Sequence, residues 1–220
     1  MDTGPQKASV MPTNSAESPR ISHAKYVFTD IVGFARNRDI DAQVGILLAL
    51  TEIVQSAVDK WVPQDDSRIF LPTGDGFCIA ILDYKTIADP EMRIALELLQ
   101  RIATRNANAT NNPRFEFHVR IGINQGLDRL IRDINGRWNL VGIGINEAHR
   151  VMELADKDQI LVGRPLYDHS LRQLPDYRNS FRHYVTEDKH GQPLEAYQFI
   201  GSEYQGLNTG EPNLPRGKHQ

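Results

Sequence analysis

Several features that would assign a chain to a special class are scarce or missing from this sequence. Its 220 residues include one cysteine, Cys78, so no disulfide can form within the chain and a reducing compartment is expected. The net charge of −3 gives no general attraction to nucleic acid or to a membrane surface. No apolar run approaches the roughly 20 residues of a membrane span, and residues 1–22 lack the apolar middle of a secretory signal. We therefore expect a cytoplasmic protein with neither a membrane nor a nucleic acid as its partner.

One domain is expected between two tails. Residues 1–22 and 203–220 are rich in proline, glycine and small polar residues and show no periodicity, so we expect a disordered N-terminal tail and a flexible C-terminal tail. The 40% hydrophobic share suffices for one core of ordinary size, which we place in residues 23–202.

Apolar periodicity and turn residues predict the elements of this domain. Strands are predicted at 25–30, 68–71, 77–82, 115–124, 127–134 and 159–162. Helices are predicted after the first strand, from Asp89-Pro90 onward, and at about 145–155. The apolar face of the first helix is expected to hold Val44, Leu47, Leu48, Val54, Val58 and Trp61. The order βαββαββαβ indicates an α+β fold, with helices packed on a mainly antiparallel sheet.

Two aspartates stand where an apolar strand meets a glycine. Asp30 lies in Phe28-Thr-Asp-Ile-Val-Gly-Phe34, and Asp75 lies in the hairpin turn Thr73-Gly-Asp-Gly-Phe77. Taken alone, Asp75 is equally well explained as a turn former and Asp30 as a cap of the following turn. Together, at the ends of strands of one sheet, the two carboxylates favour a site for hard divalent cations such as Mg2+.

A polar pair follows in Gly142-Ile-Gly-Ile-Asn-Glu-Ala-His-Arg150. Asn146 and Arg150 are four residues apart on a predicted helix, so they share one face. An amide and a guanidinium that point the same way suit a ribose oxygen and a phosphoryl group. An isolated pair of this kind would be explained more simply as the solvated face of a surface helix.

The combination of these strings, in this order, resembles the catalytic domain of class III nucleotidyl cyclases. The first string is similar to their F-x-D-I-x-G-F signature, and the second is similar to their G-D hairpin. The segment from Arg120 to Gly126 is similar to their R-I-G-I-x-x-G strand, and the segment from Asn146 to Arg150 is similar to their N-x-x-x-R helix. The similarity covers residues from about Lys25 to Phe199, and four motifs in register are far more specific than one.

The resemblance implies a ferredoxin-like or palm-like fold and a metal-dependent reaction. Asp30 and Asp75 would bind two divalent cations, Mg2+ or Mn2+, with the carbonyl of Ile31 as a further ligand. Asn146 would orient the ribose and Arg150 would stabilise charge at the α-phosphate while the 3'-oxygen attacks and pyrophosphate leaves. Because the family builds each site from two chains, the resemblance also implies a homodimer with active sites at the subunit interface.

The positions that select the base depart from the family pattern. Adenylate cyclases carry lysine four residues before the hairpin aspartate and aspartate or threonine seven before the helix asparagine, and guanylate cyclases use glutamate and cysteine. These base-binding positions correspond to Leu71 and Asn139 here. Leu71 cannot hydrogen-bond a base, whereas Asn139 offers a donor and an acceptor. Three explanations stand open: a register that differs by one residue, a divergent purine code, or a pyrimidine base.

A pyrimidine is the interpretation we favour. The chain resembles the small stand-alone cyclases of bacterial Pycsar antiphage systems, which make cyclic UMP or cyclic CMP as second messengers. Within that group we favour UTP, and cyclisation of ATP, GTP or CTP remains the alternative. The family's K-G-x-x-x-P triphosphate motif is also displaced, because Asp188-Lys-His-Gly-Gln-Pro193 places Lys189 one residue late, so Lys189 is equally a candidate phosphate contact and an ordinary surface lysine.

Two rival functions are weighed against an active cyclase. A catalytically inactive cyclase-homology domain that serves in dimerisation or sensing would usually lack one of the four motif residues, and all four are present. A diguanylate cyclase would carry a G-G-D/E-E-F hairpin, which this chain lacks.

Overall fold

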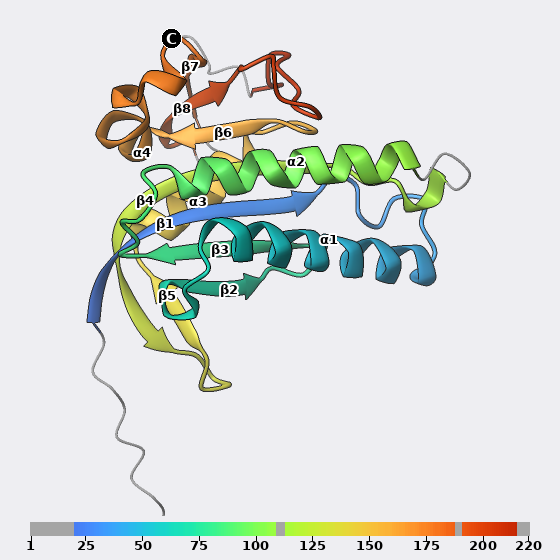
Figure 1. Cartoon of the computed structure of the whole chain (residues 1–220), viewed down its shortest axis with the longest axis horizontal. Helices are drawn as coiled ribbons and strands as arrows, with labels where there is room; N and C mark the ends of the chain where they lie inside the picture. The colour runs from blue at the N-terminus through green and yellow to red at the C-terminus, as the bar shows by residue number, and fades with distance from the viewer. Residues whose placement is uncertain (1–19, 109–112, 188–190, 215–220) are drawn as a thin grey trace, which may run out of the picture.

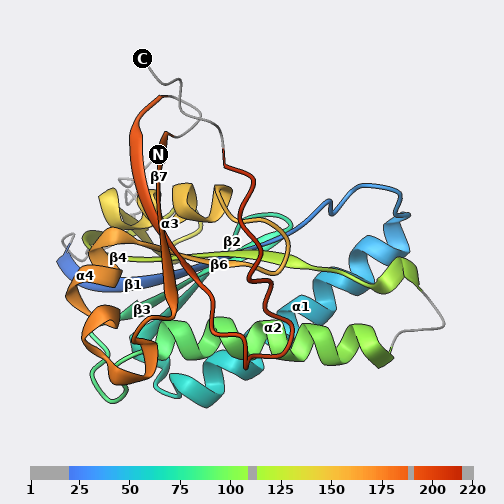
Figure 2. The same ribbon diagram turned by 90° about the horizontal axis from the view of Figure 1, so that it is seen from above.

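A sheet of eight strands forms the middle layer of the protein (Figures 1 and 2). The computed structural model describes residues 20–108, 113–187 and 191–214. The strands are β1 (Arg20–Ile31), β2 (Arg68–Pro72), β3 (Gly76–Leu82), β4 (Val119–Arg132), β5 (Trp138–Val141), β6 (Ile160–Gly163), β7 (Phe181–Glu187) and β8 (Pro193–Phe199). Their order is β2-β3-β1-β4-β6-β8-β7, with β5 paired to β4. Because only β4 and β6 pair in parallel among these described strands, the predicted mainly antiparallel α+β fold is confirmed.

The helices cover the two faces of the sheet unequally. The α-helices are α1 (Ile40–Trp61), α2 (Pro90–Asn108), α3 (Ile143–Glu153) and α4 (Arg164–His169). Figure 2 shows α1 and α2 below the sheet and α3 above it. One face of the sheet is therefore covered by the two long helices α1 and α2, whereas the other face is covered by the shorter α3.

Each face has its own apolar core. The larger core lies beneath α1 and α2 and takes side chains such as Val27, Ile79 and Ile121 from the central strands. The smaller core lies beneath α3 and takes Tyr26, Phe28 and neighbouring side chains. The side chains of β1 alternate between these two cores, as expected for a strand buried on both faces.

The predicted apolar face of α1 was partly wrong. Val44 and Leu48 are 51% and 59% exposed. The buried side chains instead follow the row Ala42, Ile46, Leu50, Val54, Ala57 and Val58. Because α1 is apolar on more than one side, its sequence does not single out the face that meets the sheet.

The expectation that no segment could span a membrane also needs correction. Within the described residues one helix, α1, is long and apolar enough by length and composition, with a mean hydropathy of 1.3 over its apolar window. In this fold its buried row of side chains packs into the larger core.

The strands of the central pair are longer than predicted. Strand β1 begins at Arg20 rather than Lys25, inside the segment expected to be a tail, and β4 is one strand where two were predicted. The two strands pair along their whole common length, from Arg20 opposite Leu130 to Ile31 opposite Val119. Hydrogen bonds between segments about a hundred residues apart thus extend both strands, and no local pattern reports such pairing.

The C-terminal part of the domain contains elements that the sequence pattern missed. Helix α4 and strands β7 and β8 were not predicted, and the apolar residues of β7, which are Phe181, Tyr184 and Val185, do not alternate with polar ones along the strand. Residues 203–214, expected within the flexible tail, lie against the domain instead. Tyr204 and Leu207 pack on the larger core, and the Gln198 amide donates to the Gly210 carbonyl at 2.6 Å.

Candidate active site

The structure brings Asp30 and Asp75 together at the end of the β1–β3 pair. Asp30 lies opposite Gly76 in the strand register, and Asp75 immediately precedes Gly76 in the β2–β3 turn. The backbone N–H of Ile31 donates to the carbonyl oxygen of Asp75 at 3.2 Å, which fixes the turn against the end of β1. Both aspartates are half-buried, so each can still reach a ligand from solvent.

Gly76 makes this close approach possible. A Cβ atom at this position would lie 2.0 Å from the backbone oxygen of Thr29, closer than any real contact. Any side chain here would push the turn, and Asp75 with it, away from Asp30. The second glycine of the Gly-Asp-Gly string is therefore required by packing, whereas the positive φ of the turn, 101°, is at Gly74.

Arg120 is a third charged residue at this place. It lies directly opposite Asp30 on β4, and its Nε and Nη2 atoms are 2.9 and 2.8 Å from Asp30 Oδ2. Burial raises the pKa of Asp30, the Arg120 guanidinium opposes that shift, and the carboxylate of Asp75 adds to it. The sequence analysis did not assign Arg120 to the site, because only the long-range β1–β4 register places it there.

The donor set at this point fits a hard divalent cation. Asp30 and Asp75 supply carboxylate oxygens, and the carbonyl oxygen of Ile31 lies at the same strand end. Oxygen atoms of these kinds are the ligands that Mg2+ and Mn2+ prefer. Among the described residues, no group of three or more His, Cys, Asp and Glu side chains is arranged to hold a metal ion. A cation here would thus be coordinated by two carboxylates, and its remaining oxygen ligands would come from water or from a phosphate-bearing substrate.

Asn146 and Arg150 both project from α3, at the predicted spacing. Asn146 is exposed and Arg150 is half-buried. Helix α3 lies directly on β4, because a Cβ at Gly122 would be 2.3 Å from the backbone of Met152 and a Cβ at Gly126 would be 2.6 Å from Gly144. The glycines of the Arg-Ile-Gly-Ile-x-x-Gly string thus let the helix backbone rest on the strand.

Asp30 and α3 lie on the same face of the sheet. Asp30 is in phase with Tyr26 and Phe28, and these two side chains are buried beneath α3. The ring of His149 contacts Phe28 edge-on at a centroid distance of 5.4 Å, so α3 reaches over β1 near Asp30.

The two expected base-binding residues do not share a face. Leu71 pairs with Cys78 and packs on the core beneath α3. On β5, Trp138 packs on the same core, whereas strand alternation turns Asn139 to the opposite face. The Asn139 side chain accepts a hydrogen bond from the neighbouring Leu140 N–H at 2.7 Å.

Trp138 is therefore the β5 residue that lies on the same face of the sheet as Leu71. The guanidinium of Arg132 lies over its ring, 3.6 Å from the centroid, and holds it in place. Counting residues back from Asn146 could not find Trp138, because the count ignores which face each strand residue takes. The other predicted contact, Lys189, lies outside the described residues.

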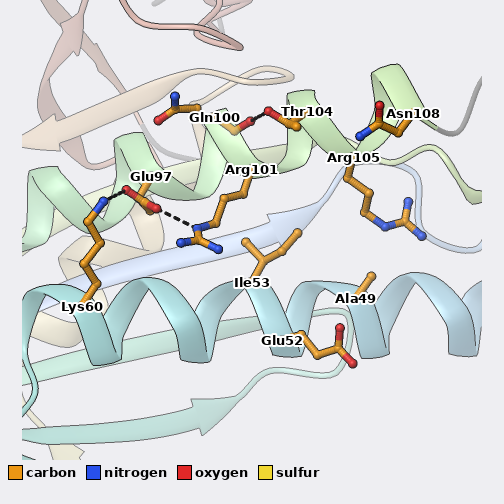
Figure 3. Close-up of a pocket in the computed structure, with 10 residues that line it drawn as sticks. All are labelled: Ala49, Glu52, Ile53, Lys60, Glu97, Gln100, Arg101, Thr104, Arg105 and Asn108. Atoms are coloured by element: carbon orange, nitrogen blue, oxygen red, sulfur yellow. Dashed lines mark hydrogen bonds and ion pairs between the residues drawn. The ribbon is translucent and has the colours of Figure 1, made fainter.

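A groove elsewhere on the molecule is less suited to this chemistry. It has a volume of about 770 Å³ and runs between α1 and α2, on the sheet face away from α3 (Figure 3). Glu97 there accepts hydrogen bonds at 2.7 Å from Lys60 and from Arg101, so its central charges are already paired. The candidate site therefore remains at the Asp30–Asp75 strand ends and α3.

Comparison with known proteins gives one family and a set of similar folds. The family model described as the adenylate and guanylate cyclase catalytic domain matches residues 16–198. No curated protein matches the sequence.

Three solved structures illustrate the similarity of fold. The guanylyl cyclase Cya2 has a TM-score of 0.66 at 15% identity, covering 88% of this chain and all of its own (100%). The adenylyl cyclase CyaB from P. aeruginosa has a TM-score of 0.60 at 16% identity, covering 87% of this chain and 100% of its own. A non-canonical dimeric guanylyl cyclase domain from Blastocladiella emersonii has a TM-score of 0.58 at 16% identity, covering 83% of this chain and 97% of its own.

Proposed function

The chain belongs to the family of adenylate and guanylate cyclase catalytic domains, and we propose that it is an active, metal-dependent nucleotidyl cyclase. Its reaction would convert a nucleoside triphosphate to a 3',5'-cyclic nucleotide and pyrophosphate. The 3'-oxygen forms a bond to the α-phosphorus, the bond to the pyrophosphate oxygen breaks, and the hydroxyl proton passes to solvent. The observation that carries the proposal is that Asp30 lies on the face of the sheet that α3 covers, with Asp75 in the turn beside it.

Each residue of the site has a role that follows from its chemistry. Asp30 and Asp75, with the Ile31 carbonyl, would hold two Mg2+ or Mn2+ ions, which neutralise the triphosphate and acidify the 3'-hydroxyl. Asn146 would hold the ribose through its amide. Arg150 would stabilise the negative charge that develops on the α-phosphate, an effect worth about 10²–10³ in rate at similar sites. Lys189 is retained as a candidate contact to the triphosphate.

The working form of the enzyme would be a homodimer. In this proposal the aspartates of one chain face Asn146 and Arg150 of the second, which gives two equivalent sites. One structural neighbour is described as a non-canonical dimeric cyclase domain and another as monomeric, so this fold occurs in both states. The exposed position of Asn146 leaves it available to a substrate held by a partner chain.

UTP is the proposed substrate, giving cyclic UMP. Leu71 and Trp138 would form the base-facing wall, which is bulky, apolar and unable to hydrogen-bond a purine edge at Leu71. Two large side chains leave less room in the base pocket, which favours a single-ring base over a purine, and the indole offers a face for stacking. ATP, GTP and CTP are the alternative substrates.

The cellular role is proposed on the same basis. Cyclic UMP would act as a second messenger in bacterial antiphage defence, and the enzyme would work in the cytoplasm. The other class of function, an inactive dimerisation or sensor module, is disfavoured because Asp30, Asp75, Asn146 and Arg150 are all present.

A product assay with each nucleotide tests the proposal. The purified protein is incubated with Mn2+ and one of the four nucleoside triphosphates, and products are identified by mass. Cyclic UMP and pyrophosphate from UTP are expected. A cyclic product from a different nucleotide would overturn the base assignment, and no cyclic product from any would overturn the cyclase itself.

Mixing two inactive variants tests whether sites are shared. Asp30→Ala and Arg150→Ala chains should each be inactive, and their mixture should regain activity because one of the two sites is then intact. Failure to regain activity, once heterodimers are shown to form, would contradict the shared site.

A further inference from the structure

A buried carboxylate on β4 lies beneath the start of α3. Asp128 is 1% exposed, and the Tyr26 hydroxyl donates to its Oδ2 at 2.6 Å. Two backbone N–H groups of α3 also donate to it, from Gly144 to Oδ1 at 3.1 Å and from Ile145 to Oδ2 at 2.8 Å. Three donors from two different elements thus converge on one charged group.

Helix α3 has no N-terminal cap of its own. The residue at its N-cap position is Gly142, whose lack of a side chain leaves the first N–H groups without a local acceptor. A Cβ at Gly142 would lie 1.9 Å from Asp128 Oδ1, so only glycine leaves room for the carboxylate. Asp128, which lies on strand β4, therefore accepts the hydrogen bonds that a local N-cap side chain would otherwise accept.

From this geometry we infer that Asp128 is a positioning residue for the candidate active site. One of the two N–H groups that it holds belongs to Ile145, the residue directly before Asn146, and Arg150 follows one turn later on the same helix. Tyr26 and Asp128 belong to the sheet of the same chain, so the carboxylate fixes the start of α3 on that sheet, and with it the direction in which Asn146 and Arg150 are presented to a partner chain's aspartates. The inference rests on the proposed function, in which Asn146 and Arg150 act on the substrate.

A carboxylate is well suited to this task and an amide is not. An ionised aspartate accepts at both oxygens and is favoured by the positive end of a helix. In Asp128→Asn the new NH2 group would face a backbone N–H donor, and one contact with α3 would be lost. The substitution keeps size and shape, so its effect reports on the hydrogen bonds.

The first test separates positioning from stability by kinetics. Asp128→Asn is expected to lower kcat about 100-fold, as a small misplacement of catalytic groups can, with KM changed less than threefold. Tyr26→Phe removes one donor and leaves both helix contacts, so a kcat loss below tenfold is expected. An unchanged kcat in a folded Asp128→Asn protein would overturn the inference.

Asp89→Asn is the matched control. Asp89 is also a buried carboxylate that accepts from a tyrosine hydroxyl, that of Tyr177, but it lies at the start of α2. This variant should lose thermal stability while its kcat stays within threefold of the parent value. An equal loss of kcat in Asp128→Asn and Asp89→Asn would overturn the positioning role, because it would show that Asp128 contributes only to general stability.

Activity regained on mixing two inactive variants is a readout that a simple loss of stability would not produce. Asp128→Ala disables the α3 half of a site, so mixing it with Asp30→Ala should regain activity, and mixing it with Arg150→Ala should not. Recovery with Arg150→Ala, or none with Asp30→Ala, would overturn the inference. The mixture of Asp30→Ala with Arg150→Ala tests the proposed function separately.

Hydrogen exchange tests the contact without any catalytic assay. Amide exchange at Gly144 and Ile145 is expected to quicken at least tenfold in Asp128→Asn, with β1 and β4 unchanged. Unchanged protection at the start of α3 would overturn the anchoring role, even if the protein proved to have no cyclase activity.

Discussion

Asp30 and Arg120 face one another across the β1–β4 pair, and two nitrogens of the guanidinium lie within 2.9 Å of one carboxylate oxygen. The guanidinium therefore occupies space that a cation bound at Asp30 would have to share. The Arg120 guanidinium also balances the negative charge of the Asp30 carboxylate, and Asp75 lies next to this ion pair. The charge of this site is thus set by three residues from three strands or turns of the sheet.

Loss of either aspartate should abolish activity by removing metal binding. Asp30→Ala and Asp75→Ala are expected to lower cyclase activity at least 10³-fold, because a metal clamp contributes several kcal/mol. Isothermal titration with Mn2+ should show the loss directly. Asp66→Ala, an exposed aspartate outside the site, is the control and should change neither quantity. Turnover that survives in Asp30→Ala would contradict the metal assignment.

Removal of the Arg120 charge should strengthen metal binding to the free protein. Arg120→Ala takes away a cation that competes for Asp30, so the Kd for Mn2+ is expected to fall about tenfold. Arg120→Lys keeps the charge and should change the Kd much less. Titration of Mn2+ followed by electron paramagnetic resonance measures both. Weaker binding in Arg120→Ala would instead mean that the guanidinium orients Asp30 for the metal.

The face taken by each β5 side chain predicts which substitution alters base selection. Trp138→Ala should lower kcat/KM for the preferred nucleotide by about 10-fold or more, since stacking of a base on an aromatic ring is worth ~1–3 kcal/mol. Asn139→Ala should change it less than threefold, because its side chain lies on the other face. Competition between two nucleotides in one assay measures the selectivity. A larger effect at Asn139 would contradict this assignment.

The buried Tyr177 should make the protein less stable in alkali. Burial, with the hydrogen bond to Asp89, raises the pKa of Tyr177 above its usual value of 10.0. The folded chain keeps the phenol proton where the unfolded chain releases it, so its stabilising effect is complete below pH 10 and declines above it. Each such group removes ~1.4 kcal/mol of unfolding free energy per pH unit.

The Tyr177→Phe variant isolates this contribution. Its unfolding free energy at neutral pH should fall by about 1 kcal/mol, because one hydrogen bond is lost. Between pH 10 and 11 it should decline less steeply than that of the parent protein. Urea denaturation at several pH values measures both slopes, and parallel slopes would count against a raised pKa at Tyr177.

The sequence was informative where function depends on short segments. The Asp-Ile-x-Gly and Gly-Asp-Gly strings and the Asn146–Arg150 spacing led to the cyclase family, and the family match confirms that resemblance. The helix start predicted at Asp89-Pro90 was also correct, since α2 begins at Pro90. These features depend on residues a few positions apart, which local geometry controls.

The tertiary structure decided everything that depends on pairing between distant segments. The β1–β4 register places Arg120 on Asp30, strand alternation turns Asn139 away from Leu71, and Asp128 reaches α3 from a different strand. Each relationship joins segments that a linear pattern treats independently, and a shift of one residue in register would reverse it. The sequence alone thus determined the family and the residue types at the strand ends, and only the folded sheet decided which side chains lie beside them.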